Sequence, residues 1–446
     1  MKKFQAITIA AMFLLMLTFS GCIGEDTGSF QVIMKSIFES SEQKLNPLPM
    51  PPDSIISPAQ KPSEINLDIY WDATVSMKGF TILEAGNIYR TLPDKLGNMG
   101  VLLNGKVNFF YFGEQITPLE GRDHLKLRNA EFYTESITSF GRVLDEANTE
   151  NLSVVVTDLF ESDSDWSNIT NKIKEKYFKN HLAVAIIGIK NSFSGEIYDV
   201  GINAANFSYD SGNDSDKFRP FYLFLMGSDA QIREFIDKWK NDLSDTKIVV
   251  FSEFFTNQPG NLQIDKAVNS KNIFGVNRLP KSDKKLKEIG ISDWEDDVEF
   301  SIPTEFNLYS ENCEVTEFKE KVKIFALNNG NWQEENNADK IVKFLPVSKN
   351  GNNYNYNLTL KFKPKNTLPL GKIGLMQVQI VVPRENIKIP DWITEWDMNN
   401  IDISAENFDG TKTVNLKSIA ESLKSSVIAD TQDKIFELDL VIDGRI

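Results

Sequence analysis

Between residues 65 and 253, continuous apolar runs alternate with amphipathic segments, and this alternation constrains the fold more than any other feature of the sequence. Uninterrupted apolar runs are typical of strands that are buried on both faces of a parallel sheet, and the amphipathic segments predict helices that cover those faces. We expect strands at 65–71, 107–112, 152–157, 182–189, 221–226 and 247–251, and helices at 82–96, 139–147, 166–178 and 229–239. The sequence therefore predicts an α/β domain over 64–256 with a doubly wound, mostly parallel sheet, and a hairpin or surface excursion at 192–217.

Apolar residues follow a period of two in the C-terminal part of the chain. At 354–362 tyrosine, leucine and phenylalanine alternate with asparagine, threonine and lysine, and the pattern recurs at 322–326, 376–382 and 436–442. Such alternation is typical of antiparallel strands with one buried face, and Asn-Gly pairs at 329–330 and 350–351 favour hairpin turns. We therefore expect an all-β, immunoglobulin-like antiparallel sandwich over 291–446, interrupted by a helix at 416–423. The polar stretch 257–290 predicts a linker.

The N-terminus has the pattern of a secretory signal, with Lys2 and Lys3 before an apolar run at 6–19 and a small pair, Ser20-Gly21. This run is shorter than the roughly 20 residues that a membrane-spanning helix needs. The sequence at 18–22 resembles the lipobox of bacterial and archaeal lipoproteins, and this implies a signal peptide at 1–21 and lipidation of Cys22. Six prolines between 47 and 62 indicate an extended tether over 22–63. We expect an extracytoplasmic protein that is anchored to the membrane by a lipidated cysteine.

Composition excludes several classes of function. Without the signal, 46 basic and 63 acidic side chains leave a net charge of −17, which disfavours nucleic acid and anionic lipid headgroups, so that membrane contact rests on the lipid alone. Besides Cys22 only Cys313 remains, so no internal disulfide is expected. The two histidines, His124 and His181, lie in no nucleophile or zinc motif. We do not expect the chain to be an enzyme.

Oxygen-bearing side chains follow the first predicted strand at alternate positions. Asp72, Thr74 and Ser76 would emerge toward one side of an extended chain, and a set of oxygen ligands suits a hard cation such as Mg²⁺. The pattern is common, and a strand end whose hydroxyls cap the next helix explains it as well. Asp158, however, ends the predicted strand at 152–157, and Thr138 precedes a predicted helix. The carboxyl ends of strands in open α/β sheets are where ligands bind.

In their order along the chain, these three segments resemble a von Willebrand factor A domain and its metal-ion-dependent adhesion site, which combines D-x-S-x-S with a loop threonine and a T-D-G-like strand end. The resemblance implies that Asp72, Thr74, Ser76, Thr138 and Asp158 hold Mg²⁺ or Mn²⁺. It further implies an open position on the cation for an exposed carboxylate of a protein ligand. The resemblance spans about residues 65–251, under half of the chain.

The chain departs from that family pattern at several positions. Thr74 replaces serine, Val75 replaces a small residue, and Leu159 stands where glycine is common. Thr134 and Ser136 lie close enough to Thr138 to be alternatives for the loop hydroxyl.

Other polar and aromatic groups have ordinary explanations. Acids at 161–165 are expected to cap a helix start, and those at 210–216 to lie in a solvated turn. Trp392 and Trp396 would form an aromatic platform or, more often, pack a core edge.

Three functions compete on this evidence. The first is a surface lipoprotein that binds a protein ligand through a divalent cation. The second is a metal-free structural or assembly subunit of a cell-envelope complex. The third, with the weakest support, is a metal-assisted envelope hydrolase that uses Asp72 and Asp158.

Overall fold

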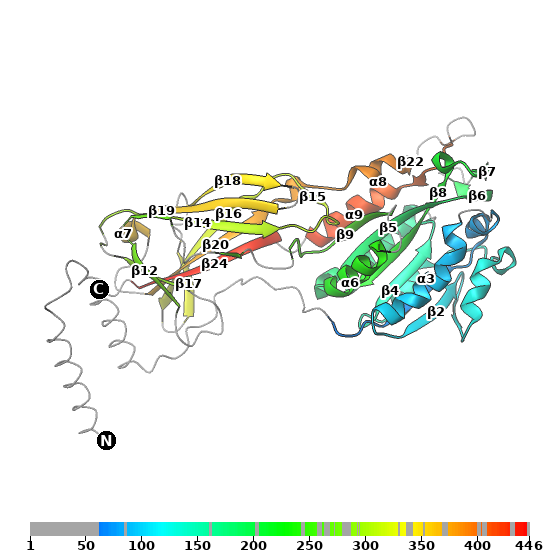
Figure 1. The fold of residues 1–446 in the computed structure, drawn as a ribbon, viewed down its shortest axis with the longest axis horizontal. Coiled ribbons are helices and arrows are strands. Elements are labelled where there is room, and N and C mark those ends of the chain that lie inside the picture. The colour runs from blue at the N-terminus through cyan, green and yellow to red at the C-terminus, as the bar shows by residue number, and fades with distance from the viewer. Residues whose placement is uncertain are drawn as a thin grey trace, which may run out of the picture.

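The computed structural model describes residues 62–83, 87–159, 163–200, 205–241 and 246–256 and, with gaps, 261–443. The expected signal peptide, Cys22 and nearly all of the tether lie outside these residues. Figure 1 shows an elongated molecule with a helix-covered sheet at one end and a strand-rich part at the other. Within the described part of the chain, no helix combines the length and the apolar character needed to cross a membrane.

A seven-stranded sheet in the order β3-β2-β1-β4-β8-β5-β9 forms the centre of the α/β part. Its strands are β1 (Leu67–Asp72), β2 (Val107–Phe112), β3 (Ile116–Leu119), β4 (Leu152–Thr157), β5 (Ala183–Asn191), β8 (Arg219–Gly227) and β9 (Lys247–Phe251). β1 pairs in parallel with β2 and β4, whereas β3, β8 and β9 run antiparallel to their neighbours. The α/β class is therefore confirmed, but the sheet is mixed, and the expected mostly parallel sheet is wrong.

The difference arises largely at β8. After β5 the chain forms the hairpin of β6 (Ser194–Val200) and β7 (Ala205–Asp210), passes a short 3-10 turn η5 (Ser215–Lys217), and returns beside β5 without a crossover helix. A return of this kind gives an antiparallel neighbour, because a parallel one needs a long crossover. Every residue of β8 is buried. An apolar run in the sequence indicates this burial but does not indicate the direction of the strand.

Helices cover both faces of the sheet. One face carries α3 (Ile88–Leu102) and α6 (Asp229–Lys240), and the other carries α4 (Phe140–Glu146) and α5 (Asp163–Lys176). Short 3-10 helices η1 (Val75–Thr81), η2 (Asp123–Arg128), η3 (Ala130–Phe132) and η4 (Phe178–Asn180) lie in the connections. Helix α6 begins with a capping box in which Ser228 and Gln231 satisfy each other's backbone N–H groups, as expected for a serine before an amphipathic run.

A C-terminal segment completes the α4–α5 face. It contains α8 (Asp391–Glu395), β22 (Asp397–Met398), β23 (Thr413–Val414) and α9 (Leu416–Ile428). The buried side chains of α8 and α9 join the core beneath α5, whereas Met398 and Val414 belong to the core on the other face. A Cβ atom at Gly188 of β5 would lie 2.7 Å from the Trp396 ring and 3.3 Å from the Trp392 ring. The two tryptophans therefore pack on the sheet and form no exposed platform. This segment falls in the range 291–446 that the sequence assigns to the sandwich, yet it packs on the α/β sheet, as Figure 1 shows for α8 and α9.

Two larger sheets form the strand-rich part. One contains β10 (Asn261–Leu262), β11 (Val268–Lys271), β14 (Val298–Asn307), β18 (Val342–Asn350) and β19 (Asn353–Phe362); the other contains β12 (Ile273–Arg278), β13 (Lys287–Ile291), β16 (Lys319–Asn328), β17 (Asn331–Glu335), β20 (Ile373–Val382) and β24 (Asp433–Asp443). This part of the chain also contains α7 (Pro364–Thr367), η7 (Arg384–Asn386) and a two-stranded pair of β15 (Glu314–Val315) and β21 (Ile387–Lys388). The strands pair antiparallel except β13 with β24, which are parallel.

The range 257–290, expected as a linker, instead contributes β10, β11, β12 and most of β13 to these sheets. β10 and β11 share one partner, β14, and β12 lies at the edge of the other sheet. β10 and β11 have two and four residues, and so they are too short to show the alternation that identifies central strands in a sequence.

Candidate functional site at the carboxyl edge of β1 and β4

Two buried carboxyl groups lie at one edge of the α/β sheet. Asp72 is the last residue of β1 and Asp158 follows the last residue of β4. Because β1 and β4 are parallel neighbours, both acids lie at the carboxyl edge, as the sequence predicted. Asp72 is 0% exposed and Asp158 is 1% exposed.

Hydroxyl groups converge on Asp72. Thr74 donates to its Oδ1 from the hydroxyl at 2.7 Å and from the backbone N–H at 3.0 Å. Oδ2 accepts from the hydroxyls of Thr157 at 3.1 Å and Thr138 at 3.3 Å. The Ser76 hydroxyl lies 3.0 Å from that of Thr74. The structure thus brings Thr74, Ser76 and Thr138 together around Asp72.

A backbone bridge holds the loop that carries Thr138. Thr74 and Glu135 form a parallel bridge, in which Val75 N–H donates to the Glu135 carbonyl and Glu135 N–H donates to that of Ala73. The bridge needs a glycine beside it, since a Cβ at Gly113 would lie 2.4 Å from the Glu135 side chain.

Among the alternatives for the loop hydroxyl, Thr134 and Ser136 are exposed, whereas Thr138 is partly buried. The hydroxyl of Thr138 is also the one that bonds Asp72. Thr138 is therefore the loop residue that joins the constellation.

Leu159 adopts a backbone conformation that favours glycine. Its φ is +60°, in the left-handed region, and this is the position where the family pattern has glycine. The Leu159 side chain is buried in the core, and its N–H donates to the Thr157 hydroxyl at 3.1 Å. That bond orients the Thr157 hydroxyl proton toward Asp72. Sequence reasoning missed Thr157, although its place directly before the strand-end acid is a usable signal.

Burial raises the pKa of Asp72 to about 7, and the nearby Asp158 adds to the shift, while the hydrogen bonds from Thr74 and Thr157 oppose it. A carboxyl group in this setting takes up either a proton or a cation near neutral pH. The edge therefore favours a bound positive charge.

One positive charge already lies beside Asp158. Arg219, the first residue of β8, places Nη2 3.7 Å from Asp158 Oδ2, and the Arg219 side chain is 1% exposed. Nη1 donates to the Gly410 carbonyl at 3.4 Å, and the guanidinium lies 5.4 Å from the Phe193 ring centre. Sequence reasoning missed Arg219, because only the antiparallel direction of β8 brings its amino end to this edge.

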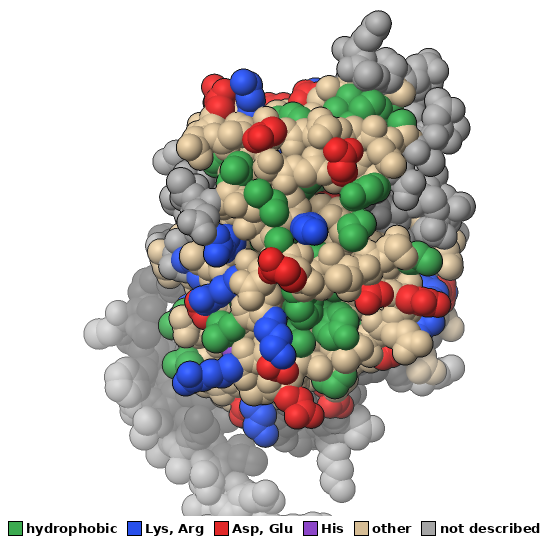
Figure 2. Space-filling view, turned by 90° about the vertical axis from the view of Figure 1, so that its right-hand side faces the viewer, with side chains coloured by type: hydrophobic (Ala, Val, Ile, Leu, Met, Phe, Trp, Pro, Cys, Tyr) green, Lys and Arg blue, Asp and Glu red, His purple; other side chains and the backbone are tan. Residues whose placement is uncertain are grey.

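Among the described side chains, the surface around this end of the molecule shows no dominant charge (Figure 2). Figure 2 shows acidic, basic and hydrophobic side chains intermixed at the end of the molecule where β6 and β7 lie. Ile137, directly before Thr138, is 56% exposed. Of the residues around Asp72, Thr138 and Ser76 are the more accessible, and a ligand would approach from their side.

The donor chemistry fits a hard cation. In the part of the chain with described side chains, no three His, Cys, Asp or Glu residues are grouped to hold a metal, so hydroxyls would complete a ligand set around the two acids. Carboxylate and hydroxyl oxygens suit Mg²⁺ or Mn²⁺, and the buried Asp72 would gain the positive charge that its surroundings favour. Asp72, Thr74, Ser76 and Thr138 would hold the ion, and Asp158 would bind directly or through water.

The other acidic groups have local roles or lie outside the described side chains. Asp210 accepts from Gly212 N–H and Asp214 accepts from Asp216 N–H, which makes this stretch an ordinary turn. Glu161 and the side chains of Asp163 and Asp165 are outside the described part.

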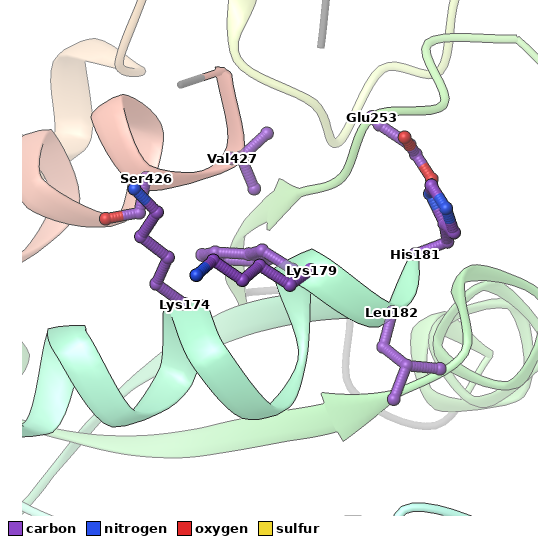
Figure 3. Close-up of a pocket in the computed structure, with 8 residues that line it drawn as sticks. Lys174, Lys179, His181, Leu182, Glu253, Ser426 and Val427 are labelled. Atoms are coloured by element: carbon purple, nitrogen blue, oxygen red, sulfur yellow. The ribbon is translucent and has the colours of Figure 1, made fainter. Parts of the chain in front are cut away.

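A separate pocket of about 310 Å³ lies between α9 and the end of α5. Figure 3 shows Ser426 and Val427 on one side, lysines on the other, and His181 next to Glu253. The His181 ring lies 2.8 Å from the Glu253 carboxyl, and Lys179 pairs with Glu175. Both pairs are formed within the protein.

The chain matches no known protein-family model and no curated protein sequence.

Proposed function

We propose that this chain is an extracytoplasmic lipoprotein, anchored through Cys22, whose α/β domain binds a protein ligand through a divalent cation at the Asp72 edge. The observation that carries the proposal is the convergence of the Thr74, Thr138 and Thr157 hydroxyls on a fully buried Asp72, with Asp158 nearby. Burying a carboxylate is unfavourable unless hydrogen bonds and a positive charge compensate for the lost hydration.

When bound, the cation would supply positive charge and an open coordination position for an outside carboxylate. The chain's own residues prepare for this. Thr157, oriented by Leu159 N–H, and Thr74 hold the Asp72 carboxyl in one orientation, and the bridge to Glu135 fixes the loop of Thr138. A protein with this net negative charge gains from a local cation when its ligand is acidic, because long-range repulsion otherwise slows association.

Titration calorimetry with Mg²⁺ and Mn²⁺ on the full mature chain tests the cation. Asp72→Asn should abolish binding. Asp68→Asn is the matched control, because Asp68 is a buried acid of the same strand whose carboxylate is bonded to Asn108 and Asn151 instead. Equal binding by wild type and Asp72→Asn would reject the site. Loss of membrane attachment in Cys22→Ser tests the anchor separately.

A second candidate is a metal-free assembly subunit of an envelope complex. The ion pair between Arg219 and Asp158 favours it, since the protein itself supplies a cation at the same edge. Co-purification of a partner from envelope extracts that persists in EDTA and in Asp72→Asn would support this function against the first one.

A further inference from the structure

The antiparallel insertion of β8 brings a buried arginine, Arg219, to the edge of the sheet that holds Asp72 and Asp158. β8 pairs with β4 in a register that sets Tyr222 opposite Thr157, so the amino end of β8, with Arg219, lies beyond the carboxyl end of β4, next to Asp158. A parallel strand at this place would present its own carboxyl end instead. The mixed sheet and the buried cation are therefore one structural feature.

Arg219 is held in its place. The Gly410 carbonyl accepts from Nη1, and the Phe193 ring lies against the guanidinium. The segment around Gly410 is itself tied to β8, because the Tyr222 hydroxyl donates to that of Thr413 at 2.8 Å. Gly410 fits against the Tyr209 ring so closely that a Cβ would lie 2.4 Å from it. The guanidinium is enclosed on several sides and cannot leave Asp158 for solvent without displacing these groups.

The charges at this edge then oppose a second cation. Among the described side chains at this edge, Asp72 and Asp158 carry at most two negative charges, and Arg219 offsets one of them. A divalent ion beside Asp72 would meet a like charge in a water-poor setting, where repulsion is far less screened than at the surface.

We propose that Arg219 sets the cation affinity of this edge by competing with the divalent ion for Asp158. The inference rests on the proposed cation site, and it assigns to Arg219 a role in weakening that site. With Arg219 in place, the ion binds weakly and exchanges readily; without it, both acids are available to the ion.

Titration calorimetry with Mg²⁺ on the full mature chain tests the competition, with thermal unfolding in Mg²⁺ and in EDTA as a second measurement. Arg219→Met removes the charge, Arg219→Gln removes it but keeps a donor for the Gly410 carbonyl, and Arg219→Lys keeps the charge. We expect both neutral variants to bind Mg²⁺ at least about tenfold more tightly than wild type, and the lysine variant to resemble wild type. Arg233→Gln is the control for loss of a largely buried arginine, since Arg233 pairs with Asp229 on α6.

The outcomes separate this inference from the proposed function. Equal Mg²⁺ affinity in wild type and both neutral variants overturns the competition and leaves the cation site intact. Binding by the neutral variants alone, lost again on Asp72→Asn, supports the competition and overturns cation binding by the natural chain. Absence of binding in every variant overturns both. Arg219→Met could fail to fold because Asp158 would lose its basic partner, and in that case Arg219→Gln is the deciding variant. If Arg219→Met folds only when Mg²⁺ is present, this result supports the competition.

Discussion

Thr157 on β4 donates a hydrogen bond of 3.1 Å to Asp72 on β1, so the ends of two parallel strands are joined by a side-chain contact at the candidate site. The same hydroxyl accepts from Leu159 N–H. The backbone conformation after β4 therefore determines which way the Thr157 hydroxyl proton points. This arrangement requires Leu159 to adopt a left-handed backbone conformation, which is strained for leucine.

We predict that Leu159→Gly is more stable than Leu159→Ala. Both variants lose the buried isopropyl group of Leu159 and should be less stable than wild type by about 2–4 kcal/mol. Only glycine adopts a φ of +60° without strain, and the glycine variant should retain about 1 kcal/mol more than the alanine variant. Urea unfolding of the two variants measures the difference. An alanine variant at least as stable as the glycine variant would contradict strain at this position.

Stability without metal should depend on the ionisation of Asp72. Its pKa is about 7 in the folded chain and about 3.8 in the unfolded chain, so folding takes up a proton between these values and stability falls as pH rises from about 4 to 7. In EDTA, wild type should lose a few kcal/mol of its free energy of unfolding over this pH range, and the Asp72→Asn variant should not show this loss. Urea unfolding of both proteins between pH 4 and 8 isolates the contribution, and parallel stability curves would argue against a raised pKa.

Gly188→Ala should loosen the C-terminal segment from the sheet. The added methyl would lie 2.7 Å from the Trp396 ring and 3.3 Å from the Trp392 ring, and overpacking of this kind costs about 1–3 kcal/mol. A shift in tryptophan fluorescence together with a lower unfolding midpoint is the expected result. Gly97→Ala on α3, where nothing lies within 4 Å of the added atom, is the control and should gain up to about 1 kcal/mol.

The bond between Tyr222 and Thr413 should couple β8 to the C-terminal segment. The two hydroxyls lie 2.8 Å apart and are buried, although 191 residues separate them in the chain. A double-mutant cycle of Tyr222→Phe and Thr413→Val should give a coupling free energy of about 0.5–1.5 kcal/mol. Additive effects of the two substitutions would show that the contact does not stabilise the segment.

The expected strands and most expected helices of the α/β part are present because the pattern of apolar residues indicates which segments are buried. Central strands need apolar residues on both faces whatever their direction, and α6 carries both its apolar stripe and its capping residues locally. The first helix was expected at 82–96 but begins at Ile88, since η1 occupies 75–81. Asp72, Thr74, Ser76 and Asp158 were identified from their places at strand ends, and parallel pairing of β1 and β4 alone brings the two acids together.

The sequence by itself determined the two kinds of sheet, the places of the two acids and the hydroxyls that follow Asp72, because these depend on local periodicity and on where strands stop. Only the tertiary structure decided the direction of β8, the arrival of Arg219 beside Asp158 and the packing of Trp396 on Gly188. These depend on pairing between segments far apart in the chain, and neither strand direction nor a distant partner leaves a periodic signal. The physical reason is that burial is a property of each residue, whereas register and direction are properties of a pair of strands.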